Sequence, residues 1–358
     1  MDSSEHGPRR RAARPPDDAT TMEHQQTPTT PMQQQDRPFL EVSDVRVWFP
    51  IRKGILNRVV AHVRAVDGVS FTLRQGETLG LVGESGCGKT TLGRAILGLE
   101  PVRSGHVLFD GEDFTALPER RRRHLRRRCQ MVFQDPQASL NPRLTVLELL
   151  TEGLRYHRLL HGETPEQAAG RLLADVGMDT DALYRYPHEF SGGQRQRLSI
   201  ARALSLKPQL LVCDEPVSAL DVSVQAQVIN LLLDLRDKYH LSYIFISHDL
   251  SVVRIISQQV AVMYLGHMVE MGPVEAVMES PRHPYTQALL SAVPVPGRPA
   301  GQRIILKGEM PSPAAPPPGC PFHPRCPHAT EACAHGDVPP LRPLPDQPGH
   351  HVACRLLN

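Results

Sequence analysis

The stretch of residues 83–90, GESGCGKT, constrains this chain more than any other. It follows the apolar run 77–82, which is typical of a strand buried on both faces, and it precedes a helical pattern over 91–99. A strand, a glycine-rich turn and a helix start form an anion site, because backbone N–H groups converge there and the helix dipole adds partial positive charge. Lys89 would reach the β- and γ-phosphates of a nucleoside triphosphate, and the Thr90 hydroxyl would bind Mg²⁺. The loop residues expected to contact the nucleotide are Gly83, Ser85, Gly86, Cys87, Gly88, Lys89, Thr90 and Thr91.

Two carboxylates follow a second buried strand. Residues 210–213 are apolar and lead directly into Asp214 and Glu215, which places both acids at the carboxyl edge of a parallel sheet. Asp214 is suited to Mg²⁺, directly or through water, and Glu215 to polarising an attacking water. The next apolar strand, 242–247, delivers His248 to the same edge, where it is expected to sense the γ-phosphate.

The overall composition narrows the function classes. The 358 residues include 40 basic and 38 acidic side chains, so the net charge of +2 gives no general nucleic-acid footprint. The seven arginines of residues 119–128 have no interleaved aromatics, which predicts a solvated helix face that meets a partner or anionic lipid headgroups. The sequence contains no run of about 18 apolar residues, so it predicts no membrane-spanning helix. An odd number of cysteines, seven, favours a reducing cytoplasm over disulfide bonding.

The chain divides by texture into three parts. Residues 1–37 are rich in Pro, Gln and Thr and poor in large apolar side chains, which predicts a disordered tail. The fold is expected to begin with a strand ending at Phe49, which could stack on an adenine ring or pack as a core aromatic. Residues 51–62 are expected to form a basic loop, and about 135–195 a helical insertion. From residue 294 the chain is proline-rich and irregular, which predicts a domain boundary and a separate C-terminal lobe.

A second segment, SGGQRQR at 191–197, resembles the signature of the ATP-binding-cassette (ABC) ATPases, and the resemblance covers about 39–293. It implies an α/β P-loop NTPase of ABC type, with a RecA-like core sheet, an antiparallel β subdomain and an inserted helical subdomain. The nucleotide would then be ATP. Gln134 is similar to the glutamine that contacts Mg²⁺ and senses the transmembrane partner. Asp221 looks like part of the loop that crosses the dimer interface.

The same resemblance implies a head-to-tail dimer of nucleotide-binding domains. Each ATP would lie between the phosphate loop of one chain and the signature of the other. The signature residues that would serve the partner's nucleotide are Ser191, Gly192, Gly193 and Gln194. Closing and reopening two such sites can drive attached transmembrane subunits.

Two further segments, 132–143 and 283–290, resemble the dipeptide/oligopeptide importer subfamily, which also includes nickel importers. The resemblance implies an ATP-hydrolysing subunit peripheral to the cytoplasmic face of the inner membrane. Its partners would be a second ABC ATPase in a heterodimer, two transmembrane permeases and an extracytoplasmic binding protein, and no nucleic acid. Nickel chelates or glutathione remain alternative cargoes, and a soluble cassette ATPase that works on ribosomes or DNA remains an alternative class.

The C-terminal lobe carries Cys320, Cys326, Cys333 and Cys354, separated by five, six and twenty residues. The paired C-x₂₋₄-C knuckles typical of structural zinc are absent. Four widely and unevenly spaced thiolates favour a [4Fe–4S] cluster, which the tail of some peptide-importer ATPases also implies, with Zn²⁺ or free thiols as alternatives. A mixed-ligand site stays possible through His323, His328 and His335.

Overall fold

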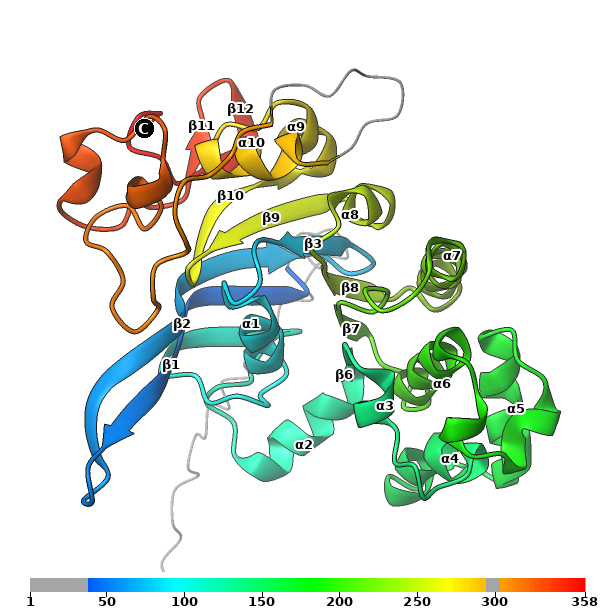
Figure 1. Ribbon diagram of the computed structural model, residues 1–358. Coiled ribbons are helices and arrows are strands. Elements are labelled where there is room, and N and C mark those ends of the chain that lie inside the picture. Colours follow the sequence, from blue (N-terminus) through cyan, green and yellow to red (C-terminus); the bar gives the residue numbers. More distant parts are fainter. Residues whose placement is uncertain (1–37, 294–302, 358) are drawn as a thin grey trace, which may run out of the picture. The chain divides into compact units, whose positions relative to one another are not determined.

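The computed structural model describes residues 38–293 and 303–357 (Figure 1). The tail 1–37, predicted to be disordered, and residues 294–302, where a domain boundary is expected, lie outside the described residues. The expected α/β fold, with a core sheet, an antiparallel subdomain and a helical insertion, is confirmed. The antiparallel sheet contains, in spatial order, β2 (Arg58–Leu73), β1 (Leu40–Lys53), β4 (Ser104–Phe109) and β5 (Glu112–Asp113). The larger sheet contains, in spatial order, β11 (Arg342–Leu344), β12 (Gln347–Val352), β10 (His267–Pro273), β9 (Gln259–Tyr264), β3 (Thr78–Val82), β8 (Ser242–Ile246), β7 (Leu210–Asp214) and β6 (Cys129–Val132).

The five strands from β9 to β6 are parallel, and they occupy one side of the larger sheet, with β6 at its edge. Every residue of β3, β7 and β8 is buried, which explains why their sequences are apolar runs rather than alternating patterns. Because the strands run in one direction, the residues that follow them meet at one edge of the sheet. This edge receives the phosphate loop, the acid pair and His248.

Apart from α2, the helices fall into two groups (Figure 1). Those of the predicted insertion lie between β6 and β7 and are α3 (Pro136–Ser139), α4 (Val146–Tyr156), α5 (Pro165–Asp175) and α6 (Gly192–Leu204), with short 3-10 turns η2 (Thr180–Tyr184) and η3 (Pro187–Glu189). Those associated with the core sheet are α1 (Lys89–Ile96), α7 (Val222–Tyr239), α8 (Leu250–Ile256), α9 (Val274–Glu279) and α10 (Pro284–Ser291). Three insertion helices begin with a reciprocal capping box, formed by Thr145, Thr164 and Ser191.

The arginine-rich helix α2 (Glu119–Arg128) buries only Leu125. Its charges are partly neutralised by neighbours: Arg126 pairs with Glu119 at 2.7 Å, and Arg128 pairs with Asp110 at 2.5 Å. Arg123 donates to the hydroxyl of Tyr156 in α4. The helix is therefore a solvated face held to the fold by one leucine and several surface contacts. Within the described ranges, no helix is long and apolar enough to cross a membrane.

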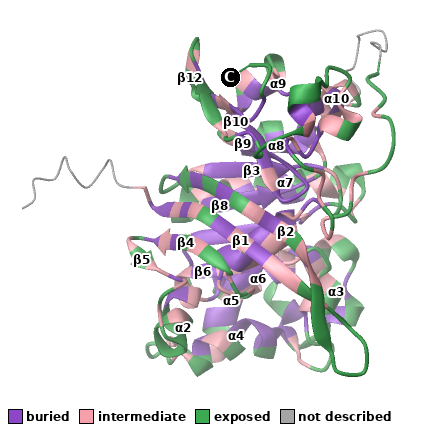
Figure 2. Ribbon diagram, turned by 90° about the vertical axis from the view of Figure 1, so that its left-hand side faces the viewer, coloured by how far each residue is buried: buried purple, intermediate pink, exposed green. Residues whose placement is uncertain are grey.

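The basic loop expected over 51–62 is instead a hairpin arm. Strands β1 and β2 remain paired as far as Lys53 and Arg58, and only residues 54–57 turn. Gly54 and Asn57 adopt positive φ angles, which suits them to a tight turn. The β-branched residues Ile51, Val59 and Val60 favour extended backbone, so the ladder continues to the basic pair Lys53 and Arg58, and the end of the arm is exposed (Figure 2).

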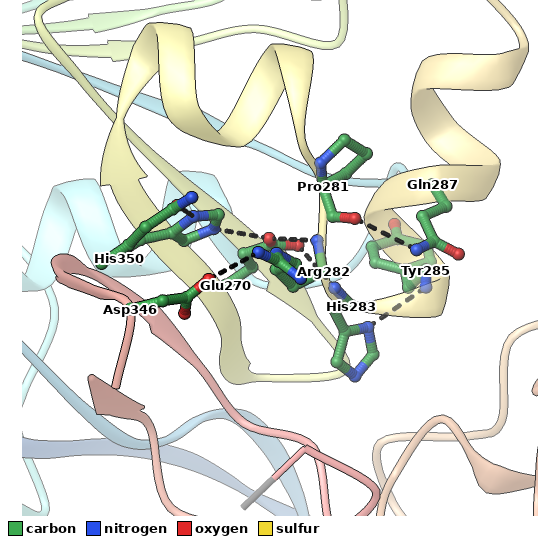
Figure 3. Close-up of polar contacts among 9 residues, drawn as sticks. Glu270, Pro281, Arg282, His283, Tyr285, Gln287, Asp346 and His350 are labelled. Carbon is green, nitrogen blue, oxygen red and sulfur yellow. Dashed lines mark hydrogen bonds and ion pairs between the residues drawn. The ribbon is translucent and has the colours of Figure 1, made fainter. Parts of the chain in front are cut away.

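The C-terminal segment, for which a separate lobe is expected, differs in the structure. Strand β12 pairs with β10, so the last residues of the chain extend the core sheet. Phe322 is buried in the same apolar core as the central strands, beside the turns η4 (His323–Arg325) and η5 (Glu331–Ala334). The lobe, defined here as residues 303–357, therefore packs into the apolar core of the central strands. A buried carboxylate, Glu270 of β10, accepts a hydrogen bond from His350 of β12 (Figure 3).

Candidate functional site

The phosphate loop is shaped by the absence of side chains at two glycines. Gly88 has φ +109°, and a Cβ atom there would lie 2.0 Å from the carbonyl oxygen of Ala65. At Gly83, with φ +150°, a Cβ would lie 2.2 Å from the carbonyl oxygen of Met263. Backbone atoms cannot move aside as a flexible side chain would, so both positions require glycine. The loop is thereby packed between strand β2 and the end of β9.

Lys89 is buried at the start of α1, and its ammonium group holds the loop by hydrogen bonds to loop carbonyls. Its Nζ donates to the carbonyl oxygens of Gly83 at 2.8 Å and Glu84 at 3.0 Å. The neighbouring Thr90 hydroxyl donates to Asp214 Oδ1 at 2.9 Å, across from α1 to the end of β7. Burial raises the pKa of Asp214, and the hydrogen bond from Thr90 opposes that rise. A hydroxyl beside a carboxylate is the oxygen ligand set that a hard cation such as Mg²⁺ prefers.

Glu215 is the centre of a small polar network at the same edge. Its Oε2 accepts a hydrogen bond from Gln134 Nε2 at 2.9 Å and lies 3.5 Å from His248 Nδ1. Its backbone has φ +44°, a strained value for a residue other than glycine, and its N–H donates to the carbonyl of Ile246 in β8. Three residues from three strand ends thus converge. The positions of Glu215 and His248 after buried strands predict that these two meet, whereas Gln134 is expected here only from the family resemblance. A carboxylate so held can accept a proton from a water molecule.

These residues surround a cavity of about 430 Å³. Phe49, the predicted adenine-stacking residue, does not line it and packs, half-buried, against the apolar core of the antiparallel sheet. The Cys87 side chain is buried in that core too, so only the Cys87 backbone can contact a nucleotide. The lining residues are Val63, Ala65, Ser85, Gly86, Gly88, Lys89, Thr90, Thr91, Gln134, Glu215, His248 and Pro313.

Three lining residues carry no sequence signal. Val63 and Ala65 belong to β2, and Pro313 belongs to the C-terminal lobe, more than 200 positions after the loop. The Pro313 carbonyl accepts a hydrogen bond from the Arg64 N–H at 2.9 Å, which fixes this part of the lobe beside β2. Only the pairing of β2 with β1 and the return of the lobe bring these residues to the cavity. No motif could have marked them.

The predicted signature residues lie outside that cavity. Ser191 caps α6, accepting from the Gln194 N–H, and Gly192 lines a second cavity of about 130 Å³ that Gln134 also borders. A Cβ at Gly193 would lie 2.4 Å from Val224 Cγ1, so the signature packs closely on α7. Asp221 caps α7 by accepting from the Val224 N–H. Within one chain the signature residues therefore do not line the phosphate cavity.

The four lobe cysteines are close enough to affect one another. Burial raises the pKa of Cys320, and the thiols of Cys333, Cys354 and Cys326 raise that pKa further. The pKa of Cys333 is lowered, chiefly by the Thr330 side-chain hydrogen bond. Among the described residues, however, no three or more histidine, cysteine or acidic side chains are arranged to hold a metal ion.

Comparisons with known proteins agree with this geometry. Residues 66–218 match the family model of the ABC transporter, and residues 269–333 match that of the oligopeptide/dipeptide transporter C-terminal region. The oligopeptide transport ATP-binding protein AppF of Bacillus subtilis is 53% identical over 324 residues, which are 89% of this chain and 98% of that protein. The glutathione import ATP-binding protein GsiA of Pectobacterium atrosepticum is 52% identical over 278 residues, or 77% of this chain and 45% of that protein.

A solved structure of an ATP-binding cassette has a similar fold. It is the dimeric post-hydrolysis state of the ATP-binding cassette MJ0796 bound to ADP and Pi, with a TM-score of 0.58 and 25% identity. The match covers 66% of this chain and 98% of that one. The phosphate loop, the acid pair and both family models lead to one conclusion: the chain belongs to the ATP-binding proteins of the ABC transporter family, in the group with the oligopeptide/dipeptide transporter C-terminal region.

Proposed function

We propose that this chain hydrolyses ATP to energise a membrane importer of dipeptides or oligopeptides. The observation that carries the proposal is the convergence of Glu215, Gln134 and His248 beside the phosphate loop. That arrangement provides a base for water next to a site for phosphates within one chain. The peptide cargo is supported by the match of residues 269–333 and by the name of the Bacillus subtilis relative.

In the proposed mechanism the chain positions charge rather than forming covalent bonds. The backbone N–H groups of the phosphate loop bind phosphate oxygens, and Lys89 turns from the loop carbonyls toward the β- and γ-phosphates. Mg²⁺, when bound, neutralises charge that develops on the phosphoryl oxygens, and Thr90, Asp214 and the amide oxygen of Gln134 would hold it. Glu215 accepts a proton from the attacking water. His248, exposed beside Glu215, donates to the γ-phosphate.

The catalytic unit in this proposal is a head-to-tail dimer. Ser191, Gly192, Gly193 and Gln194 sit at a helix N-terminus outside their own chain's phosphate cavity, so they are free to serve the nucleotide of a partner. Asp221 lies at the start of the neighbouring helix and would line the same interface. The MJ0796 cassette, whose fold is similar, is dimeric in its solved structure. The partner here is a second ABC ATPase.

The permeases would dock beside the helical insertion. A cavity of about 440 Å³ opens between β6, α4 and α6, and its walls include Phe133, Glu152 and Tyr156. Phe133 directly precedes Gln134, which donates to Glu215. A permease segment that displaces Phe133 would therefore also shift Gln134 and its hydrogen bond to Glu215. In this arrangement the chain is peripheral to the cytoplasmic face of the inner membrane, with two permeases and an extracytoplasmic binding protein as partners. Glutathione is an alternative cargo, suggested by the name of the Pectobacterium relative, and nickel chelates are a second one.

The four thiols of the lobe would hold a [4Fe–4S] cluster, with Zn²⁺ as the alternative. Their chemistry suits such a group, and their mutual effect on pKa places them in one region. Among the described residues the four thiols do not form a metal-binding group as they stand. Anaerobic purification with iron, sulfide and zinc analysis tests this. About four irons and four sulfides per chain would support the cluster, stoichiometric zinc would support the alternative, and no metal would refute both.

The ATPase proposal is tested by Glu215→Gln. The variant should bind MgATP as the parent does and lose about 100-fold or more of its phosphate release, because the base is gone while the binding groups remain. Glu166→Gln, which changes an exposed acid of α5, is the matched control and should hydrolyse ATP normally. Undiminished turnover in Glu215→Gln would remove Glu215 from catalysis.

The transport proposal needs a separate measurement. A tagged full-length chain should sediment with membranes and co-purify in detergent with two permeases. Transport of a labelled peptide by the reconstituted assembly should stop with Glu215→Gln and continue with Glu166→Gln. A chain that hydrolyses ATP but associates with no permease would contradict the importer role and leave the ATPase intact.

A further inference from the structure

An ion pair joins the C-terminal lobe to the phosphate loop. Arg325 Nη1 lies 2.9 Å from Glu84 Oε2 and 3.1 Å from Glu84 Oε1. Glu84 is the second residue of the loop, and Arg325 ends the turn η4 some 240 positions later. The Arg325 side chain is only 9% exposed, and its Nε is buried with no hydrogen-bond partner among the described residues. The arginine is therefore largely shielded from solvent, whereas the Glu84 side chain stays 30% exposed.

A second contact holds the same loop residue. The Glu84 N–H donates to the hydroxyl of Tyr285 at 2.8 Å, and Tyr285 is fully buried in α10. The lobe touches this tyrosine as well, because Phe322 packs on it with ring centroids 5.4 Å apart. Phe322 also lies edge-on to Tyr264 at 5.2 Å, and the Tyr264 hydroxyl is 3.5 Å from Arg325 Nη1. The turn at residues 322–325 thus contacts Glu84 directly through Arg325 and indirectly through Phe322 and Tyr285.

These contacts matter for the position of the loop. The polar groups of Glu84 have separate partners: its N–H donates to the Tyr285 hydroxyl, its carbonyl oxygen accepts from Lys89 and from the Cys87 N–H, and its carboxylate accepts from Arg325. When Lys89 turns toward a phosphate, the contacts with Tyr285 and Arg325 remain. Without them only the hydrogen bond from the Cys87 N–H, at 3.3 Å, would still hold Glu84, and the N–H groups that follow Glu84 would lose part of their common direction.

We propose that Arg325, with Tyr285, is a positioning residue of the ATP site, through which the C-terminal lobe holds the phosphate loop in its nucleotide-binding shape. Neither residue touches the nucleotide cavity, so both act through Glu84. The lobe is then part of the ATP-binding apparatus and not only an appendage of the core sheet. This inference depends on ATP binding and is independent of the cargo and of the permeases.

The first test is the affinity of the purified full-length chain for MgATP, measured by calorimetry on Arg325→Gln. The dissociation constant should rise about tenfold, because the loop must be ordered at the moment of binding. Arg325→Lys keeps a charge near Glu84 and should recover part of the affinity. Tyr285→Phe keeps the buried ring, removes only the hydroxyl and should weaken binding by itself. Since it changes no charge, it tests the loop if Arg325→Gln fails to fold.

The matched control is Asp346→Asn. Asp346 pairs with Arg282 at 3.0 Å and also joins the lobe to the core, but this pair lies on the surface away from the loop. The control should bind MgATP like the parent. A double-mutant cycle combines Arg325→Gln with Glu84→Gln. If Arg325 acts through Glu84, the double variant should bind MgATP about as tightly as the single variant with the lower affinity.

Two outcomes would overturn the proposal. One is parent-like MgATP affinity in both Arg325→Gln and Tyr285→Phe, whatever their melting temperatures. The other is equal loss of affinity in Asp346→Asn, which would show that any loosening of the lobe has the same effect. A failure of Glu215→Gln to stop hydrolysis would leave this proposal untouched, since binding is measured without turnover.

Discussion

At the scale of single residues, the site depends on close approaches that only small residues permit. The loop passes so near to β2 that Gly88 would place a Cβ 2.0 Å from the Ala65 carbonyl oxygen. The same approach creates the cavity, because Ala65 and Val63 form its wall. The motif's last glycine is therefore required by packing against a strand that the motif does not include, as well as by its own φ of +109°.

Gly88→Ala should abolish most MgATP binding, with at least about a tenfold rise in the dissociation constant, because the clash is with rigid backbone. Gly76→Ala is the matched control. Gly76 also has a positive φ, +76°, but a Cβ added there would meet no atom within 4 Å. It should lose about 1 kcal/mol of stability from strain alone and keep its ATP affinity. Equal affinities in the two variants would show that the contact with Ala65 does not shape the loop.

At the scale of elements, helix starts carry both stability and function. Ser191 caps α6 by the same reciprocal box that Thr145 provides for α4, although only Ser191 belongs to the family signature. Helix α10 is different, because its cap is the buried His283. The His283 Nδ1 accepts a hydrogen bond from the Tyr285 N–H at 3.1 Å, so that nitrogen carries no proton. Burial lowers the pKa of His283 to about 4.

His283 should therefore make the fold sensitive to acid. In the unfolded chain this histidine takes up a proton near pH 6.5, whereas in the folded chain it does so only near pH 4. The stability linked to its neutral form is complete above pH 6.5 and is lost as pH falls toward 4, in total on the order of 3 kcal/mol.

His283→Asn keeps an acceptor at the helix cap and removes the titration. Compared with the parent, it should lose about 2 kcal/mol less unfolding free energy between pH 7 and pH 5 in urea titrations. His161→Asn changes an exposed loop histidine and should retain the full loss. An unchanged pH dependence in His283→Asn would mean that other groups govern the acid response.

At the scale of the described fold, the C-terminal lobe is held to the core by a buried acid. Glu270 is fully buried and accepts from the N–H groups of Arg282 and His283 and from His350 Nε2, at 2.7, 2.9 and 2.7 Å (Figure 3). The acid belongs to β10, the two N–H groups precede α10, and His350 belongs to β12. One carboxylate therefore ties three elements that are distant in sequence.

Glu270→Gln should cost about 3 kcal/mol of stability, because an amide nitrogen would face a donor in a dry site. Hydrogen exchange should show early loss of protection in β12 and at the start of α10, while β3 and β8 stay protected. Glu279→Gln is the control, since Glu279 pairs with Arg254 at the surface and should contribute less than about 1 kcal/mol. Simultaneous loss of protection in every strand would refute a separate role for this contact.

The sequence by itself determined the elements and the chemistry near the phosphate loop. Buried parallel strands have apolar runs, and the residues just after them must meet at one edge, so Lys89, Asp214, Glu215 and His248 could be grouped from local pattern alone. Capping residues such as Ser191 marked helix starts in the same way. The cargo, the dimer and the metal content stay predictions.

Only the tertiary structure decided which distant segments touch the site. The basic loop became a hairpin arm, because strand pairing depends on a partner and not on local charge. The lobe pairs with the core sheet through β12 and contacts Glu84 through Arg325. The spacing of apolar residues in the sequence predicts neither contact. Likewise Phe49 packs, half-buried, against an apolar core, while Val63, Ala65 and Pro313 line the cavity. The local sequence pattern indicates which side chains must be buried, capped or hydrogen-bonded. The packing of the whole chain determines which distant residue is the partner.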